Sequence, residues 1–131
     1  MLRTFLFSFA VLLAFGFSSC SNGPGQGGQA SIQGKVYATN YNSTCTIVNG
    51  EFYAPDEDVY IIYGDDPSYG DRVKTAPDGT FWFRYLRPGK YTIYAYSKDC
   101  TAPSGKEAKS ISVEITEKKQ AVVLDDLQIK K

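Results

Sequence analysis

The chain has 131 residues, of which 15% are aromatic and 21% charged, and its 14 basic residues balance its 14 acidic ones. A chain with no excess of basic residues lacks the electrostatic footprint of a nucleic-acid-binding protein, so we expect no nucleic-acid partner. The sequence contains no histidine, which excludes Ser-His-Asp and Cys-His catalysis and any zinc site with histidine ligands.

The N-terminal segment has the pattern of an export signal. Arg3 precedes an apolar run over residues 5–17, and Cys20 follows directly after two serines. The run is shorter than the roughly 20 residues that a transmembrane helix needs, so we predict a cleaved signal peptide over residues 1–19. The cysteine in this position resembles the lipobox of bacterial lipoproteins, which implies a lipid (diacylglycerol with palmitate) on Cys20. An ordinary secretory signal with an incidental cysteine is the alternative.

A polar segment rich in glycine follows the predicted lipid site. Residues 21–29 read SNGPGQGGQ, which is the composition of a flexible linker. As a coil, such a linker spans roughly 15–20 Å, enough to hold a domain clear of lipid headgroups. We therefore assign residues 20–29 to a lipidated tether and residues 30–131 to a single folded domain.

The rest of the chain alternates short apolar strands with turn signals, and no segment keeps a helical period over three turns. Asn49-Gly50 is a strong signal for a two-residue hairpin turn. Pro77-Asp78-Gly79 and Arg87-Pro88-Gly89 predict further turns. This pattern predicts an all-β, single antiparallel β-sandwich of about seven strands plus an extra hairpin. We expect strands near residues 32–36, 44–48, 51–53, 58–63, 72–75, 80–86, 91–96, 109–116 and 121–129.

The strongest motif runs from Asp78-Gly79 through a strand to Pro88-Gly89 and Tyr91. It predicts two facing strands joined by a turn, with one apolar face toward the core. The motif resembles that of carboxypeptidase regulatory-like domains, which are transthyretin-like β-sandwiches related to Cna-B-type pilin domains. The resemblance covers residues 30–131 and implies a non-catalytic binding or structural module. The inward side chains of the two strands should be Phe81, Phe83, Tyr91, Ile93 and Ala95.

Three cysteines stand in a chain predicted to be exported, where disulfides persist. If Cys20 carries lipid, Cys45 and Cys100 are the one pair left to bond. In an up-and-down sandwich with one added hairpin, both of these cysteines lie near the same end of the sheets. We predict a disulfide between them, with two free thiols as the alternative.

A candidate binding surface follows from strand alternation. The side chains of Trp82 and Arg84 point away from the predicted core, as do those of Tyr94 and Tyr96 on the facing strand. An exposed aromatic row beside an arginine can stack sugars or receive a protein loop. The alternative is that a second sheet, the extra hairpin or the chain terminus covers these rings.

We expect no enzymatic activity, no cofactor and no metal site. Asp125 and Asp126 are adjacent on a predicted strand, so their carboxylates point to opposite faces and cannot act together. Eight acidic residues lie between Glu51 and Asp78, but their spacing matches no calcium-binding loop.

Together these features predict a cell-envelope lipoprotein with a non-catalytic binding domain. We expect its partners to be the membrane, through the lipid, and an envelope protein or glycan, in an accessory role to an envelope complex or a polysaccharide-handling system. Ser21 after the cysteine is typical of lipoproteins sent to the outer membrane, in its periplasmic or surface leaflet. An adhesin or fibre subunit that assembles through edge strands is the alternative.

Overall fold

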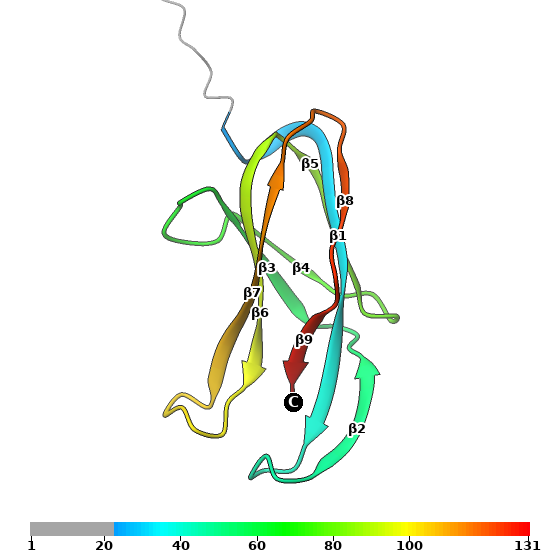
Figure 1. Ribbon diagram of the computed structural model, residues 1–131, viewed down its shortest axis with the longest axis vertical. Coiled ribbons are helices and arrows are strands. Elements are labelled where there is room, and N and C mark those ends of the chain that lie inside the picture. The colour runs from blue at the N-terminus through cyan, green and yellow to red at the C-terminus, as the bar shows by residue number, and fades with distance from the viewer. Residues whose placement is uncertain (1–22) are drawn as a thin grey trace, which may run out of the picture.

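The computed structural model describes residues 23–131, which form two β-sheets packed face to face (Figure 1). The predicted all-β sandwich is therefore confirmed. The predicted signal peptide and lipid site, residues 1–20, lie outside the described residues. Among the residues described there is no helix long and apolar enough to cross a membrane.

The first sheet is built around one long central strand, β1. One edge of β1 carries β5 and then β2, both antiparallel to it, while its other edge carries β8 and then β9, both parallel to it. The prediction of an antiparallel sandwich is wrong for this second edge, because the chain crosses over from the other sheet and then runs in the direction of β1. The strands of this sheet are β1 (Gln26–Tyr41), β2 (Val48–Tyr53), β5 (Thr80–Leu86), β8 (Ala121–Val123) and β9 (Leu127–Lys130).

The second sheet is antiparallel throughout, with the order β4-β3-β6-β7. Residues 23–131 thus contain nine strands, the number predicted, but they are divided differently. Residues 44–47, predicted as a strand, form a turn, and the strand predicted over residues 121–129 is divided into β8 and β9. The strands of the second sheet are β3 (Asp58–Tyr63), β4 (Asp71–Lys74), β6 (Gly89–Lys98) and β7 (Lys106–Ile115).

The turn at Arg87-Pro88 carries the chain from one sheet to the other. β5 pairs with β1, whereas β6 pairs with β3 and β7, so the two strands that we predicted to face each other within one motif are not neighbours in a sheet. They face each other across the core instead. The predicted inward side chains are confirmed, since each is at most 2% exposed: Phe81, Phe83, Tyr91, Ile93 and Ala95.

The added hairpin is present, but its turn is not at Asn49-Gly50. Both residues lie inside β2, and a shift in register leaves Asn49 without a partner on β1. The turn is formed by residues 42–47, where the side-chain oxygen of Asn42 accepts hydrogen bonds from the backbone N–H groups of Thr46 (2.8 Å) and Ile47 (3.1 Å). The prediction of a turn at Asn49-Gly50 is therefore wrong. Intrinsic turn preference does not include the contacts of the Asn42 side chain, which place the turn several residues closer to the N-terminus.

The folded domain begins before residue 30. β1 starts at Gln26, and the residues ahead of it are fixed to the end of the sandwich by the buried side chain of Tyr91. The hydroxyl of Tyr91 donates to the carbonyl of Arg87 (2.5 Å) and accepts from the N–H of Gly25 (2.8 Å). The ring of Pro24 lies so close to Gly89 that a Cβ there would come within 2.8 Å of it. Residues 23–29, which we assigned to the flexible tether, are therefore part of the domain.

We expect Tyr91→Phe to lower the free energy of unfolding by about 1–3 kcal/mol, because it leaves the buried N–H of Gly25 without a partner. Urea denaturation measures this loss, and faster amide exchange at Gly25 would locate it. Tyr85→Phe is the matched control: its ring is 66% exposed, and its stability should change by less than about 0.5 kcal/mol. Equal stability of the two variants would contradict the role of the Tyr91 hydroxyl.

Candidate functional site

Four tyrosines gather on the outer face of the second sheet, and we call them the tyrosine platform: Tyr60, Tyr69, Tyr94 and Tyr96. Tyr60 on β3 is the direct cross-strand partner of Tyr94 on β6, and their rings stack at 4.9 Å with an angle of 10° between the planes. Tyr69, from the loop between β3 and β4, and Tyr96 both meet the Tyr60 ring edge to face, at 4.9 and 5.7 Å. Strand alternation explains the gathering, because it turns Tyr60, Tyr94 and Tyr96 away from the core.

The platform is exposed at both of its flanks and partly buried at its centre. Tyr69 and Tyr96 are each 48% exposed, whereas Tyr60 and Tyr94 are half-buried. Burial raises the pKa of Tyr94 above its ordinary value, and the neighbouring Tyr96 and Tyr60 add to the rise. Arg72 stands beside the platform, where its interaction with the Tyr60 hydroxyl and then the charge of Asp58 raise its pKa. The centre is thus a fixed stack, and the two flanks are open to a ligand.

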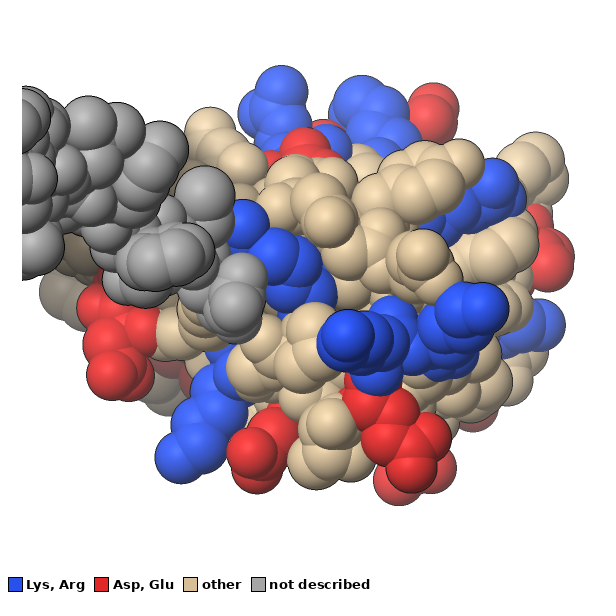
Figure 2. Space-filling model, turned by 90° about the horizontal axis from the view of Figure 1, so that it is seen from above, with Lys and Arg blue, Asp and Glu red and all other residues tan. Residues whose placement is uncertain are grey.

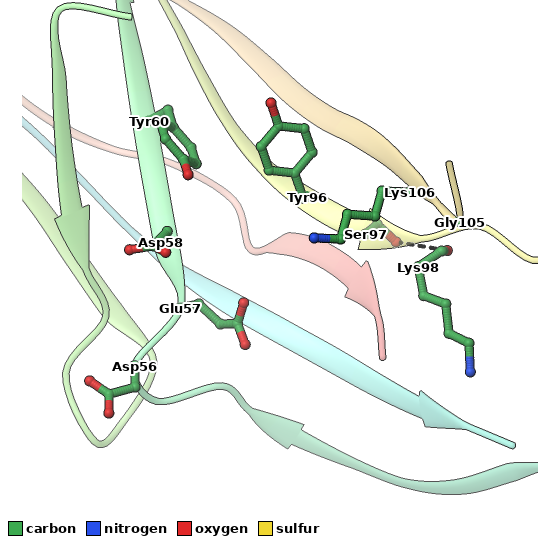
Figure 3. A pocket seen from close by; sticks show the side chains of 9 residues that line it. All are labelled: Asp56, Glu57, Asp58, Tyr60, Tyr96, Ser97, Lys98, Gly105 and Lys106. Carbon is green, nitrogen blue, oxygen red and sulfur yellow. Dashed lines mark hydrogen bonds between the residues drawn. The ribbon is translucent and has the colours of Figure 1, made fainter. Parts of the chain in front are cut away.

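A pocket of about 380 Å³ adjoins the platform (Figure 3). Tyr60 and Tyr96 form one part of its wall, and the ammonium group of Lys106 is directed over the pocket from β7. Aromatic rings and polar groups therefore meet in one cavity. The lining residues are Asp56, Glu57, Asp58, Tyr60, Tyr96, Ser97, Lys98, Gly105 and Lys106.

Two of the acids in the pocket wall are paired with cations. Glu57 forms an ion pair with Lys131. Asp58 lies 3.3 Å from the ammonium of Lys74 and 3.9 Å from the guanidinium of Arg72. Its Oδ1 is buried and accepts no hydrogen bond of good geometry from the described residues. Carboxylates held in this way by cations can orient a polar ligand.

A disulfide anchors the β6–β7 loop, which contributes Gly105 to the lining of the pocket. Cys45, in the turn after β1, is bonded to Cys100, in the loop between β6 and β7, with 6.2 Å between the Cα atoms. The predicted pairing is confirmed. The ammonium of Lys98 adds a second link by donating to the carbonyl of Asn42 (2.9 Å). Lys98 is the last residue of β6 and Gly105 lies in the loop that follows it. The disulfide and the Lys98 hydrogen bond therefore restrain the part of the pocket that these two residues line.

The predicted surface of Trp82, Arg84, Tyr94 and Tyr96 is not one surface. Trp82 and Arg84 lie together on β5, with the Arg84 guanidinium 3.4 Å from the centre of the Trp82 ring. Tyr94 and Tyr96 lie on β6, in the other sheet. Since outward side chains of two packed sheets point in opposite directions, the two pairs stand on opposite sides of the sandwich. This corrects the prediction, which had treated β5 and β6 as neighbours.

Sequence reasoning missed two members of the platform. Tyr60 had a usable signal, because the alternation of β3 places it outward between Val59 and Ile61. The identity of its cross-strand partner was the information that was lacking. Tyr69 had no signal, since it stands in a loop where periodicity says nothing about direction.

The described residues contain no group of three or more Cys, Asp or Glu side chains placed to hold a metal ion. The arrangement instead suits the binding of a polar ligand with flat apolar faces. Aromatic rings bind such faces, and the charged groups of the pocket can hydrogen-bond to the ligand's edges.

The chain matches no protein-family model and no curated protein. Its fold is similar to that of a solved structure from Pseudomonas aeruginosa, described as a candidate carbohydrate-binding protein, with a TM-score of 0.50. The two chains are 17% identical, and the match covers 77% of this chain and 90% of the other. At this identity the likeness supports the shared β-sandwich fold and does not by itself transfer a function.

The buried centre of the tyrosine platform predicts a loss of stability in alkali. The raised pKa of Tyr94 means that the unfolded chain releases this proton first, near pH 10. Stability is therefore full below that pH and falls as the pH rises through the folded-state pKa. We expect the urea midpoint to fall above about pH 10 and Tyr94→Phe to reduce the slope of that fall. Trp82→Phe removes no ionisable group and should keep the original slope; an unaltered slope in Tyr94→Phe would contradict the prediction.

Proposed function

We propose that this chain is a non-catalytic glycan-binding domain, and that the tyrosine platform with its adjoining pocket is the binding site. The observation that carries the proposal is that two half-exposed rings, Tyr69 and Tyr96, both pack edge to face against the Tyr60 ring of a tyrosine stack. A sugar ring has an apolar face of C–H groups that packs on an aromatic ring, while its hydroxyls need polar partners. Lys106 and Asp58 supply such partners beside Tyr96.

Two further observations support a binding role without catalysis. The chain has no histidine, and Glu57 and Asp58 are engaged in ion pairs rather than standing as a free acid and base. The Pseudomonas aeruginosa protein with a similar fold is a candidate carbohydrate-binding protein, which agrees with the chemistry of the platform.

The test is binding to a panel of immobilised polysaccharides, with purified protein and single alanine variants. Tyr96→Ala and Tyr69→Ala should each weaken binding by about 5- to 10-fold, the value of one aromatic stacking contact. Trp82→Ala is the matched control, because it removes an aromatic ring 45% exposed on the opposite side of the sandwich. Loss of binding in Trp82→Ala, with both tyrosine variants unaffected, would move the site to the other sheet and refute the proposal.

We further propose that the domain is held in the cell envelope, at the outer membrane, by a lipid on Cys20. The export pattern of residues 1–19 and the small residues before the cysteine support this anchorage. In an accessory role to an envelope complex, such a domain would keep a glycan near the membrane.

Growth of the source cells with a labelled fatty acid tests the anchorage. We expect the label on the wild-type protein in the membrane fraction and its loss in Cys20→Ser. Cys45→Ser controls for cysteine substitution, since its sulfur is engaged in the disulfide, and it should keep the label. Unlabelled wild-type protein in the cytosol, with the leader still attached, would contradict the proposal.

A further inference from the structure

The N-terminal end of the sandwich is tied to the first described residues by three hydrogen bonds. The Nε of Arg87 donates to the carbonyl of Gly23 (2.8 Å), and its backbone N–H donates to the carbonyl of Gly25 (2.9 Å). The hydroxyl of Tyr91 accepts from the N–H of Gly25 (2.8 Å). The chain is therefore fixed to the domain from Gly23 onward, and not from residue 30.

This attachment leaves almost no free linker after the proposed lipid site. Two residues, 21 and 22, separate Cys20 from Gly23. Three steps along a fully extended chain span at most about 11 Å. A domain with its lipid in a bilayer and so short a connection cannot stand clear of the headgroups.

Cations are concentrated in two of the turns at this end of the sandwich. The turns at residues 87–90 and 116–120 carry four cations and one acid: Arg87, Lys90, Lys118, Lys119 and Glu117. The β3–β4 loop, beside Gly23 and Lys90, adds Asp65 and Asp66, so the acids gather on the side of the second sheet and Lys118 and Lys119 stand on the side of the first. Seen from this end, Lys and Arg side chains stand over the surface, and Asp and Glu side chains lie mostly around its rim (Figure 2). Anionic lipids attract lysine and arginine at the bilayer surface.

Tyr85 adds an exposed aromatic ring at the same end. It is 66% exposed and has a φ of +59°, a left-handed conformation that is costly for a residue with a bulky side chain. The conformation breaks the alternation of β5, so that Arg84 and Tyr85 are both exposed before Leu86 returns to the core. Tyrosine is enriched at membrane interfaces, where its ring lies among the headgroups.

We infer that the N-terminal end of the sandwich lies directly on an anionic phospholipid surface, with Tyr85, Lys118 and Lys119 among the headgroups. The inference rests on the lipid anchor proposed above. It goes beyond that anchor because it fixes the orientation of the domain. The glycan pocket includes part of the β6–β7 loop, which lies at the opposite end of the sandwich from the first described residues (Figure 1).

The orientation is measured with the full acylated protein in vesicles of phosphatidylethanolamine and phosphatidylglycerol. Trp82 is the single tryptophan of the chain, so Trp82→Tyr gives a background without tryptophan fluorescence. Tyr85→Trp places a reporter at the membrane-facing end, and Phe52→Trp places one on the exposed strand β2, away from that end. Brominated phospholipids should quench the first reporter and leave the second unquenched.

The charge contribution is tested in the same vesicles. Lys118→Gln together with Lys119→Gln should speed transfer of the acylated protein between vesicles by about 30-fold, the value of two lysine contacts with an anionic surface. The matched control is Lys109→Gln together with Lys130→Gln, which removes two cations from β7 and β9 and should leave the rate unchanged.

The outcomes separate this inference from the anchor on which it rests. If the acylated protein binds vesicles but the reporter at position 85 stays unquenched, the anchor is supported and the orientation is overturned. Equal transfer rates in the two double-lysine variants lead to the same conclusion. Wild-type protein that carries no acyl group overturns both. Quenching at position 85 alone, with slower transfer in the wild type than in Lys118→Gln/Lys119→Gln, supports the orientation.

Discussion

The hydroxyl of Tyr91 is the contact on which the rest of the architecture depends. By donating to the carbonyl of Arg87 four residues earlier, it fixes the turn through which the chain leaves the first sheet and enters the second. By accepting the N–H of Gly25, it also ties the start of the described chain to that turn. The side chain of Tyr91 is only 2% exposed, and its hydroxyl, the one polar atom it buries, is hydrogen-bonded. It therefore holds the turn and the start of the described chain in place at no cost from an unpaired buried polar group.

The crossing at Arg87-Pro88 explains both the success and the error of the sequence analysis. Alternation along β5 and β6 predicted which side chains face the core, and Phe81 and Ile93 confirm it. Alternation reports only the face of a strand, however, and not the neighbour with which the strand shares hydrogen bonds. A tight turn between two amphipathic strands fits a hairpin and a crossing equally well, so Trp82 and Tyr94 were assigned to one surface although they stand on opposite sides.

The disulfide was predicted correctly and the position of the hairpin turn was not, because the two depend on different levels of structure. The bond between Cys45 and Cys100 could be predicted because it depends on which end of the sheets each cysteine reaches, and an added hairpin does not change that end. The position of the turn depends on local contacts instead. The side chain of Asn42 and the bond at Cys45 decide it, and they outweigh the intrinsic preference of Asn49-Gly50. The pocket depends on this turn, because Lys98 donates to the carbonyl of Asn42.

The two ends of the sandwich therefore have different chemistry, and the long strand β1 separates them. At its start, Gly25 and the turn around Arg87 form an end that is fixed by hydrogen bonds and rich in cations. Beyond its last residues, the disulfide links the turn after β1 to the β6–β7 loop, and Gly105 of that loop lines the pocket beside Tyr96. Tyr96 lies seven residues along β6 from Gly89, so strand spacing places the aromatic wall of the pocket about 23 Å from the turn at Arg87-Pro88. A ligand in the pocket and a surface against the first end would therefore contact separate parts of the sandwich, and neither contact would obstruct the other.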